Sequence, residues 1–174
     1  DMEDKLRKIK EAIKKVLDEI RKLLEDIRRR LKRVREEIEE IHKRNEEEND
    51  RVKKELNVTE DLLREIEEVD KKLKEDSEDH KKKVDEVRKR LEDKLETLRK
   101  RAEDLAKKID DDLRKDGVTD ELIKKIRELL EELKDELRKL LEEAEEVLER
   151  LKRSVEELSR RNKKLVEDLD RKTR

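Results

Sequence analysis

Apolar residues recur along the chain in alternating steps of four and three. In the last third they fall at Leu133, Leu137, Leu140, Ala144, Val147, Leu151, Val155 and Leu158. Five such positions span 18 residues, which is about 3.6 residues per position, the period of a straight α-helix. The same steps run from Ile9 to Ile27 and from Leu73 to Leu91. The pattern predicts long helices that each carry one narrow apolar face.

Two short segments interrupt this stripe and resemble each other closely. Asn57 and Gly117 suit the left-handed backbone position that closes a helix. Two residues later, Thr59 and Thr119 are predicted N-caps, each accepting a hydrogen bond from a backbone N–H of the next helix. These signals place three helices at about 2–56, 59–116 and 119–173.

The predicted fold class is all-α. Connections this short force neighbouring helices to run antiparallel, so we expect one domain over 1–174, an elongated up-down-up three-helix bundle that is nearly straight. A single very long helix that forms an oligomer is the rival interpretation. Two capped breaks at near-equal spacing argue against it.

Composition narrows the classes of protein and partner. Charged residues make up 62% of the chain and apolar residues 30%, with no aromatic residue and no cysteine. The apolar residues are concentrated on one face, which argues against disorder. The net charge of −2 favours neither nucleic acid nor an anionic membrane. We expect no signal peptide and no transmembrane segment. We expect acidic residues of the third helix to complement the basic run between Arg28 and Arg35.

Several stripe positions are polar, and further polar residues flank the stripe. On it stand Asn45, Asn49, Ser77, His80 and Asn162, and beside it His42, Asp70, Ser154 and Ser159. A buried polar group without a partner costs about 1–3 kcal/mol, so such residues are expected in satisfied sets. We align the antiparallel helices by taking the two connections as the points where the chain reverses direction. In this alignment Asn45 lies at the same height along the bundle as Asp70, and His80 lies beside Ser154.

This alignment of the helices predicts two interhelical polar networks. One comprises His42, Asn45, Asp70, Ser159 and Asn162, and the other comprises Ser77, His80 and Ser154. Their predicted role is to fix the register of the helices, because slipped helices would leave these groups unpaired. The alternative is that these side chains merely reach solvent from a thin bundle.

No pattern of catalytic or metal-binding residues stands out. Glu39 and His42 have the Glu-x-x-His spacing of di-iron bundles, but Ser77 takes the place of the glutamate before His80. One glycine leaves no phosphate-binding loop, and a bundle filled by side chains has no pocket for a substrate. We therefore expect no catalytic residue, no metal and no cofactor. Asn57 and Thr59 match an N-glycosylation acceptor, which turn geometry alone explains.

With these features the whole chain resembles de novo designed, parametrically generated helical bundles. The resemblance rests on the 18-residue stripe, the two matching connections, the alternating charged surface and the absence of aromatic residues. It implies a very stable, soluble, monomeric scaffold without an evolved ligand or partner, cytoplasmic in a recombinant host. Two alternatives stay open. One is a self-associating or partner-binding module, using Leu17, Leu24, Leu141 and Leu148; the other is a bundle that responds to pH through its histidines.

Overall fold

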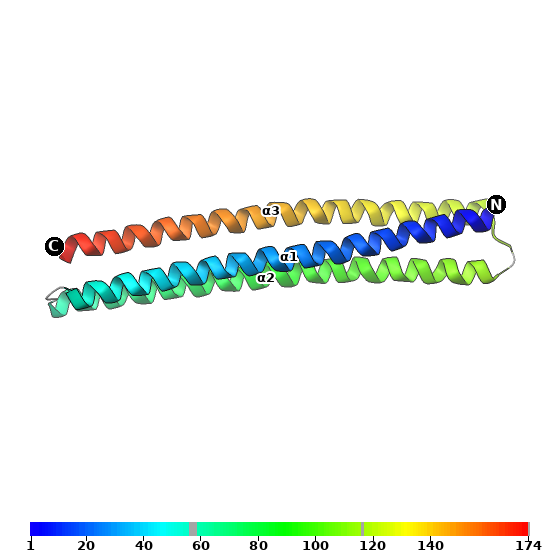
Figure 1. Ribbon diagram of the computed structural model, residues 1–174. Coiled ribbons are helices and arrows are strands. Elements are labelled where there is room, and N and C mark those ends of the chain that lie inside the picture. Colours follow the sequence, from blue (N-terminus) through cyan, green and yellow to red (C-terminus); the bar gives the residue numbers. More distant parts are fainter. Residues whose placement is uncertain (56–58, 116, 174) are drawn as a thin grey trace. The chain divides into compact units, whose positions relative to one another are not determined.

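Three helices account for almost all of the structure. The computed structural model describes residues 1–55, 59–115 and 117–173. Helix α1 spans Met2–Glu55, α2 spans Glu60–Arg114 and α3 spans Asp120–Thr173 (Figure 1). The described residues contain no strand, and the three helices pack against one another. The predicted all-α three-helix class is confirmed, and each predicted helix boundary lies within two residues of the observed one.

The chain divides into two compact units of equal length, and each helix contributes a segment to both. Unit 1 comprises Asp1–Arg28 and Arg88–Glu146. Unit 2 comprises Arg29–Val87 and Val147–Arg174.

Unit 1 has a core made only of apolar side chains, as far as the described residues show. Twenty buried apolar side chains lie in this unit, drawn from all three helices. They are Leu6, Ile9, Ile13, Val16, Ile20, Leu23 and Ile27 on α1, Leu91, Leu95, Leu98, Ala102, Leu105 and Ile109 on α2, and Ile123, Ile126, Leu130, Leu133, Leu137, Leu140 and Ala144 on α3. Their steps of three and four residues put each set on one helical face. Burying one such large side chain contributes about 1.5–3 kcal/mol.

Unit 2 has a sparser and more polar core. Thirteen buried apolar side chains lie in it, together with all five buried polar side chains of the described residues. The polar ones are Asn45, Asn49, Ser77, His80 and Asn162. On α1, Asn45 and Asn49 are the only buried side chains between Ile38 and Val52. Val52, Ile66 and Leu169 form a small apolar cluster of their own.

The capping predictions agree with the backbone geometry. The Leu62 N–H donates to Thr59 Oγ1 at 3.3 Å, and the Leu122 N–H donates to Thr119 Oγ1 at 3.2 Å. Each threonine therefore satisfies one of the N–H groups that lack a partner at a helix start. Gly117 has a φ of 107°, a backbone conformation that favours glycine. Asn57, the counterpart of Gly117, lies outside the described residues.

Removing a cap gives a first testable prediction. Thr119→Ala is expected to lower the free energy of unfolding by about 1 kcal/mol, because an N–H of the first turn of α3 loses its acceptor. Thr97→Ala is the matched control, since the exposed Thr97 hydroxyl only donates to the carbonyl of Asp93 within α2 and alanine favours a helix interior. Equal losses in the two variants, measured by chemical denaturation, would show that the cap contributes nothing.

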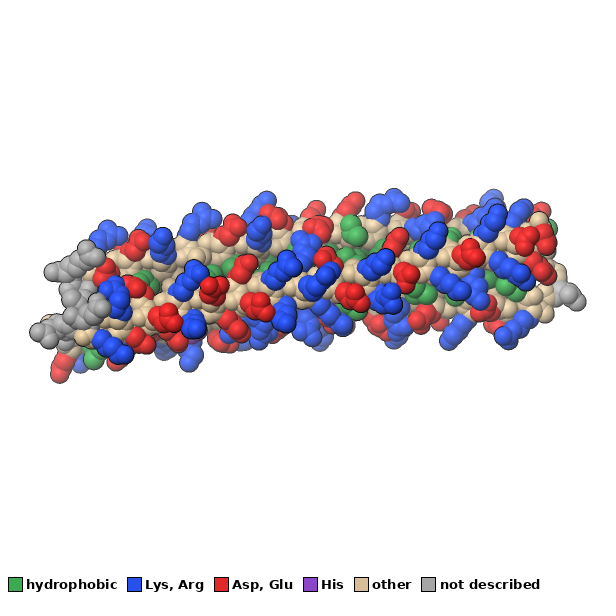
Figure 2. Space-filling model, viewed as in Figure 1, with side chains coloured by type: hydrophobic (Ala, Val, Ile, Leu, Met, Phe, Trp, Pro, Cys, Tyr) green, Lys and Arg blue, Asp and Glu red, His purple; other side chains and the backbone are tan. Residues whose placement is uncertain are grey.

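Ion pairs link the helices at the surface. Arg28 pairs with Glu92 at 2.9 Å in unit 1, and Arg35 pairs with Asp85 at 2.7 Å in unit 2. Two arginines of the basic run therefore have their partners on α2, not on the third helix as expected. Figure 2 shows basic and acidic side chains interspersed on the visible face, with apolar side chains between them. Exposed pairs of this kind contribute about 0–1 kcal/mol each.

Candidate functional site

The polar positions singled out in the sequence all belong to unit 2. Asn49 and Asn162 are completely buried, and Asn45, Ser77 and His80 are also buried. His42, Asp70 and Ser154 are half-buried. Ser159 is exposed, so its predicted place in the first network is wrong. It directly follows the fully buried Leu158, and one residue turns a helical side chain by about 100°, here toward solvent.

His80 joins α2 to α3. Its Nε2 lies 3.0 Å from Ser154 Oγ, and its Nδ1 lies 2.8 Å from the carbonyl oxygen of Asp76. A carbonyl oxygen only accepts, so Nδ1 carries a proton, and in the neutral ring Nε2 accepts from the Ser154 hydroxyl. The predicted His80–Ser154 contact is therefore present. Ser77 is buried as expected, but its hydroxyl has no partner among the described residues.

Asp70 joins α2 to α1, with a partner different from the expected one. Its carboxylate accepts from the Asn49 side-chain amide and, at 3.1 Å, from Lys53 Nζ. Asn45 was the predicted partner and makes no such bond; its Nδ2 has no partner in the described part of the chain. The two asparagines are one helical turn apart on the same face of α1. Shifting α1 by one turn relative to α2 keeps the same apolar faces in contact. The apolar pattern therefore does not indicate which of the two asparagines lies opposite Asp70.

His42 also departs from the first network. Its Nε2 lies 3.0 Å from a Glu46 carboxylate oxygen, one turn along the same helix. Its Nδ1 is buried and finds no partner within the described residues. His42 thus makes a local contact on α1, without the expected contact to Ser159.

Unpartnered polar atoms gather in unit 2. Among the described residues, buried side-chain atoms without a hydrogen-bond partner are His42 Nδ1, Asn45 Nδ2, Asn49 Oδ1, Ser77 Oγ, Asp112 Oδ2, and both Asn162 Nδ2 and Asn162 Oδ1. All except the Asp112 atom belong to unit 2. The predicted first network is therefore not formed as a connected set. Among the predicted network residues, His80 contacts Ser154 and Asp70 contacts the neighbouring helix through Asn49. The several unpartnered buried polar groups weaken the core of unit 2.

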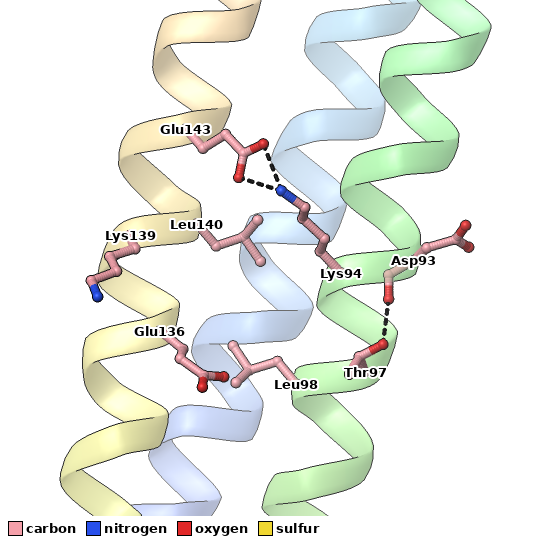
Figure 3. A pocket seen from close by; sticks show the side chains of 8 residues that line it. All are labelled: Asp93, Lys94, Thr97, Leu98, Glu136, Lys139, Leu140 and Glu143. Atoms are coloured by element: carbon pink, nitrogen blue, oxygen red, sulfur yellow. Dashed lines mark hydrogen bonds and ion pairs between the residues drawn. The ribbon is translucent and has the colours of Figure 1, made fainter.

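A groove lies between α2 and α3 in unit 1, and the sequence pattern did not predict it. Figure 3 shows Leu98 and Leu140 pointing toward each other from these two helices at its floor. The groove encloses about 380 Å³. At its edge Lys94 Nζ lies 2.7 Å from both carboxylate oxygens of Glu143. In the sequence, charged residues flank both leucines. Charged residues flank the apolar positions of every helix in the same way, so this pattern did not predict a groove here.

Two glutamates at this groove, Glu136 and Glu143, accept hydrogen bonds from basic side chains that favour their ionised form. Hydrogen bonds from Lys94, and secondarily from Arg90, hold the pKa of Glu143 below its usual value. A hydrogen bond from Arg101 similarly lowers the pKa of Glu136. A carboxyl group with a lowered pKa is poorly suited to donate a proton near neutral pH. The groove thus offers an apolar floor with ion pairs above it.

These contacts predict a dependence of stability on pH. Because the pKa of Glu143 is lower in the folded protein, its stabilising contribution is complete above its usual value of about 4.5 and is lost as the pH falls through the lower folded value. Glu143→Gln is expected to cost about 0.5–1 kcal/mol at pH 7 and less at pH 3. Denaturation series at both pH values measure this difference. The control is Glu142→Gln at the adjacent, exposed position; an equal effect there would contradict the assignment.

Other kinds of site find little support in the geometry. No group of three or more potential metal-ligating side chains occurs within the described residues. Glu39 and His42 have separate contacts, Glu39 with Lys81 and His42 with Glu46. None of the helices, as far as they are described, has the length and apolar character needed to cross a membrane. Comparison with family models, curated proteins and solved structures gives no match.

Proposed function

We propose that this chain is a structural scaffold, a de novo designed helical bundle whose sequence serves its fold. The observation that carries the proposal is the core of unit 1. Twenty apolar side chains from three helices fill it, at the spacing of a straight helix, and no polar residue among the described residues of this unit is buried as a whole. Such an interior stabilises helix packing, and the apolar side chains that make it up carry no group for chemistry.

Features of the whole chain support the proposal of a designed origin. The stripe keeps one period over long stretches, and aromatic residues are absent. Thr59 and Thr119 cap their helices with the same donor–acceptor spacing. Local turn chemistry, apolar pattern and capping thus agree with one another, which is the consistency that designed sequences are built to have.

A self-associating module is the competing proposal, and the exposed surface gives it little support. Leu141 and Leu63 are the exposed large apolar side chains among the described residues, at 47% and 39%. Leu148, which we expected at such a surface, is buried. Leu17 and Leu24 are half-buried. Single exposed leucines are ordinary on a monomer, whereas association needs a continuous apolar patch.

Sedimentation equilibrium tests the scaffold proposal against this alternative. We expect the mass of one chain, 21.3 kDa, at every concentration from about 1 to 100 µM. A mass that rises with concentration would contradict a monomeric scaffold. In that case Leu141→Glu tests whether the exposed leucine lies in the interface between chains. If it does, the introduced charge is expected to restore the monomer.

A further inference from the structure

We infer that part of unit 2 opens as a cooperative segment of its own while unit 1 stays folded. This segment, the polar section, comprises residues 42–55, 59–80 and 154–173. It lies entirely in unit 2. The inference is independent of the proposed function, because it depends on the distribution of buried groups and not on the purpose of the molecule.

The first support is the composition of the buried side chains. The polar section contains all five buried polar side chains of the described chain and seven buried apolar ones. The apolar ones are Val52, Ile66, Leu73, Val155, Leu158, Val166 and Leu169. Unit 1 buries twenty apolar side chains and no polar one among its described residues. Because apolar burial is the main force that holds such helices together, the polar section is held less strongly.

The second support is the state of the buried polar groups. Neither side-chain nitrogen nor oxygen of Asn162 has a partner among the described residues, although the residue is completely buried. Asn49 Oδ1 and Ser77 Oγ are in the same condition. Opening returns these atoms to water, where each regains hydrogen bonds. The polar section therefore gives up less on opening than an apolar section would.

The third support is how the remaining contacts are distributed. Val52, Ile66 and Leu169 form a small cluster separate from other buried residues. On α1, Asn45 and Asn49 separate Val52 from Ile38, the preceding buried apolar residue. The two interhelical hydrogen bonds of His80 and Asn49 also lie inside the section. Contacts from all three helices are thus lost together once it opens, which makes the opening cooperative.

Native-state hydrogen exchange of the full chain, followed by mass spectrometry in low denaturant, tests this inference. We expect amides of the polar section to exchange about 100-fold faster than amides in residues 13–27, 91–109 and 126–144 of unit 1. We also expect the three segments of the polar section to share one opening free energy. Helix-end fraying would instead give rates that rise gradually toward residues 55 and 173. Equal protection in both units, or such a gradient, would overturn the inference.

A combined variant distinguishes the buried polar groups from other causes. Asn45→Leu, Ser77→Ala and Asn162→Leu together replace three groups that contain unpartnered atoms. Exchange in the polar section is expected to slow at least about tenfold, with unit 1 unchanged. Ser159→Ala is the matched control, because this serine of the same section is exposed; its exchange is expected to stay the same. Unchanged exchange in the combined variant would overturn the inference.

Discussion

Leu95→Asp is expected to lower the free energy of unfolding by about 4–5 kcal/mol. Leu95 lies on α2 in unit 1 and is 1% exposed. The substitution removes a buried apolar side chain and puts a carboxylate into a core where the described side chains are all apolar. An ionised group buried without a partner costs several kcal/mol, and a protonated one still lacks hydrogen bonds. Chemical denaturation followed by far-UV circular dichroism measures the loss.

Two companion variants separate the causes of that loss. Leu95→Ala removes the apolar contacts without adding a charge and is expected to cost about 2–4 kcal/mol. Lys89→Asp changes charge at an exposed position of the same helix and unit, and it is expected to matter by about 0.5 kcal/mol or less. A Leu95→Asp variant no less stable than Lys89→Asp would contradict the burial of this stripe.

Asn162→Leu is expected to raise the free energy of unfolding by about 1–3 kcal/mol. The side chain is completely buried, and its two polar atoms have no partner in the part of the chain that the structure describes. Leucine has the same number and branching of side-chain heavy atoms and fits the same stripe position. The folded state thereby loses an uncompensated polar group and gains apolar burial. The denaturation midpoint of the variant, compared with that of the parent chain, measures the gain.

Ser159→Ala is the control for this gain. It removes a polar group from an exposed position of the same helix, and we expect a change within about 0.5 kcal/mol. A loss of stability in Asn162→Leu would contradict the view that this asparagine is unpartnered. It would favour the original hypothesis that Asn162 belongs to a satisfied network.

The fold was predictable because its signals are local and repeat. Steps of three and four residues define a helix face wherever they occur, as at Ile13 and Val16. Thr59 and Thr119 mark helix starts because a hydroxyl there meets an unpaired N–H. Neither inference needs knowledge of a distant part of the chain. Helix bounds and fold class were accordingly predicted well from the sequence alone.

Polar contacts between helices were predicted less well, because they depend on register to within one turn. Asn45 and Asn49 lie on the same face, and only the second contacts Asp70. Ser159 was placed in a network although its angular position next to Leu158 turns it outward. His80 and Ser154 were placed correctly. The role of these contacts in fixing register stays a prediction.

Surface features were the hardest to predict from the stripe. Leu148 flanks the stripe, as does Leu141, yet only Leu141 is exposed. A flanking position becomes buried when a second helix covers it, and this depends on how the helices are rotated about their axes. The groove above Leu98 and Leu140 depends on the same rotation. A periodic pattern in one helix does not contain that information.

Intramolecular cross-linking tests most directly the central claim that one chain folds by packing antiparallel neighbours. The chain has no cysteine, so introduced pairs are unique. Arg35→Cys with Asp85→Cys replaces an ion pair between α1 and α2, and Arg90→Cys with Glu143→Cys replaces one between α2 and α3. With a short bismaleimide in dilute solution, both variants are predicted to give a cross-linked single chain. Moving the second cysteine of the first pair from Asp85 to Lys74 is predicted to abolish that product. Products that join two chains, or no product in either variant, would contradict the fold.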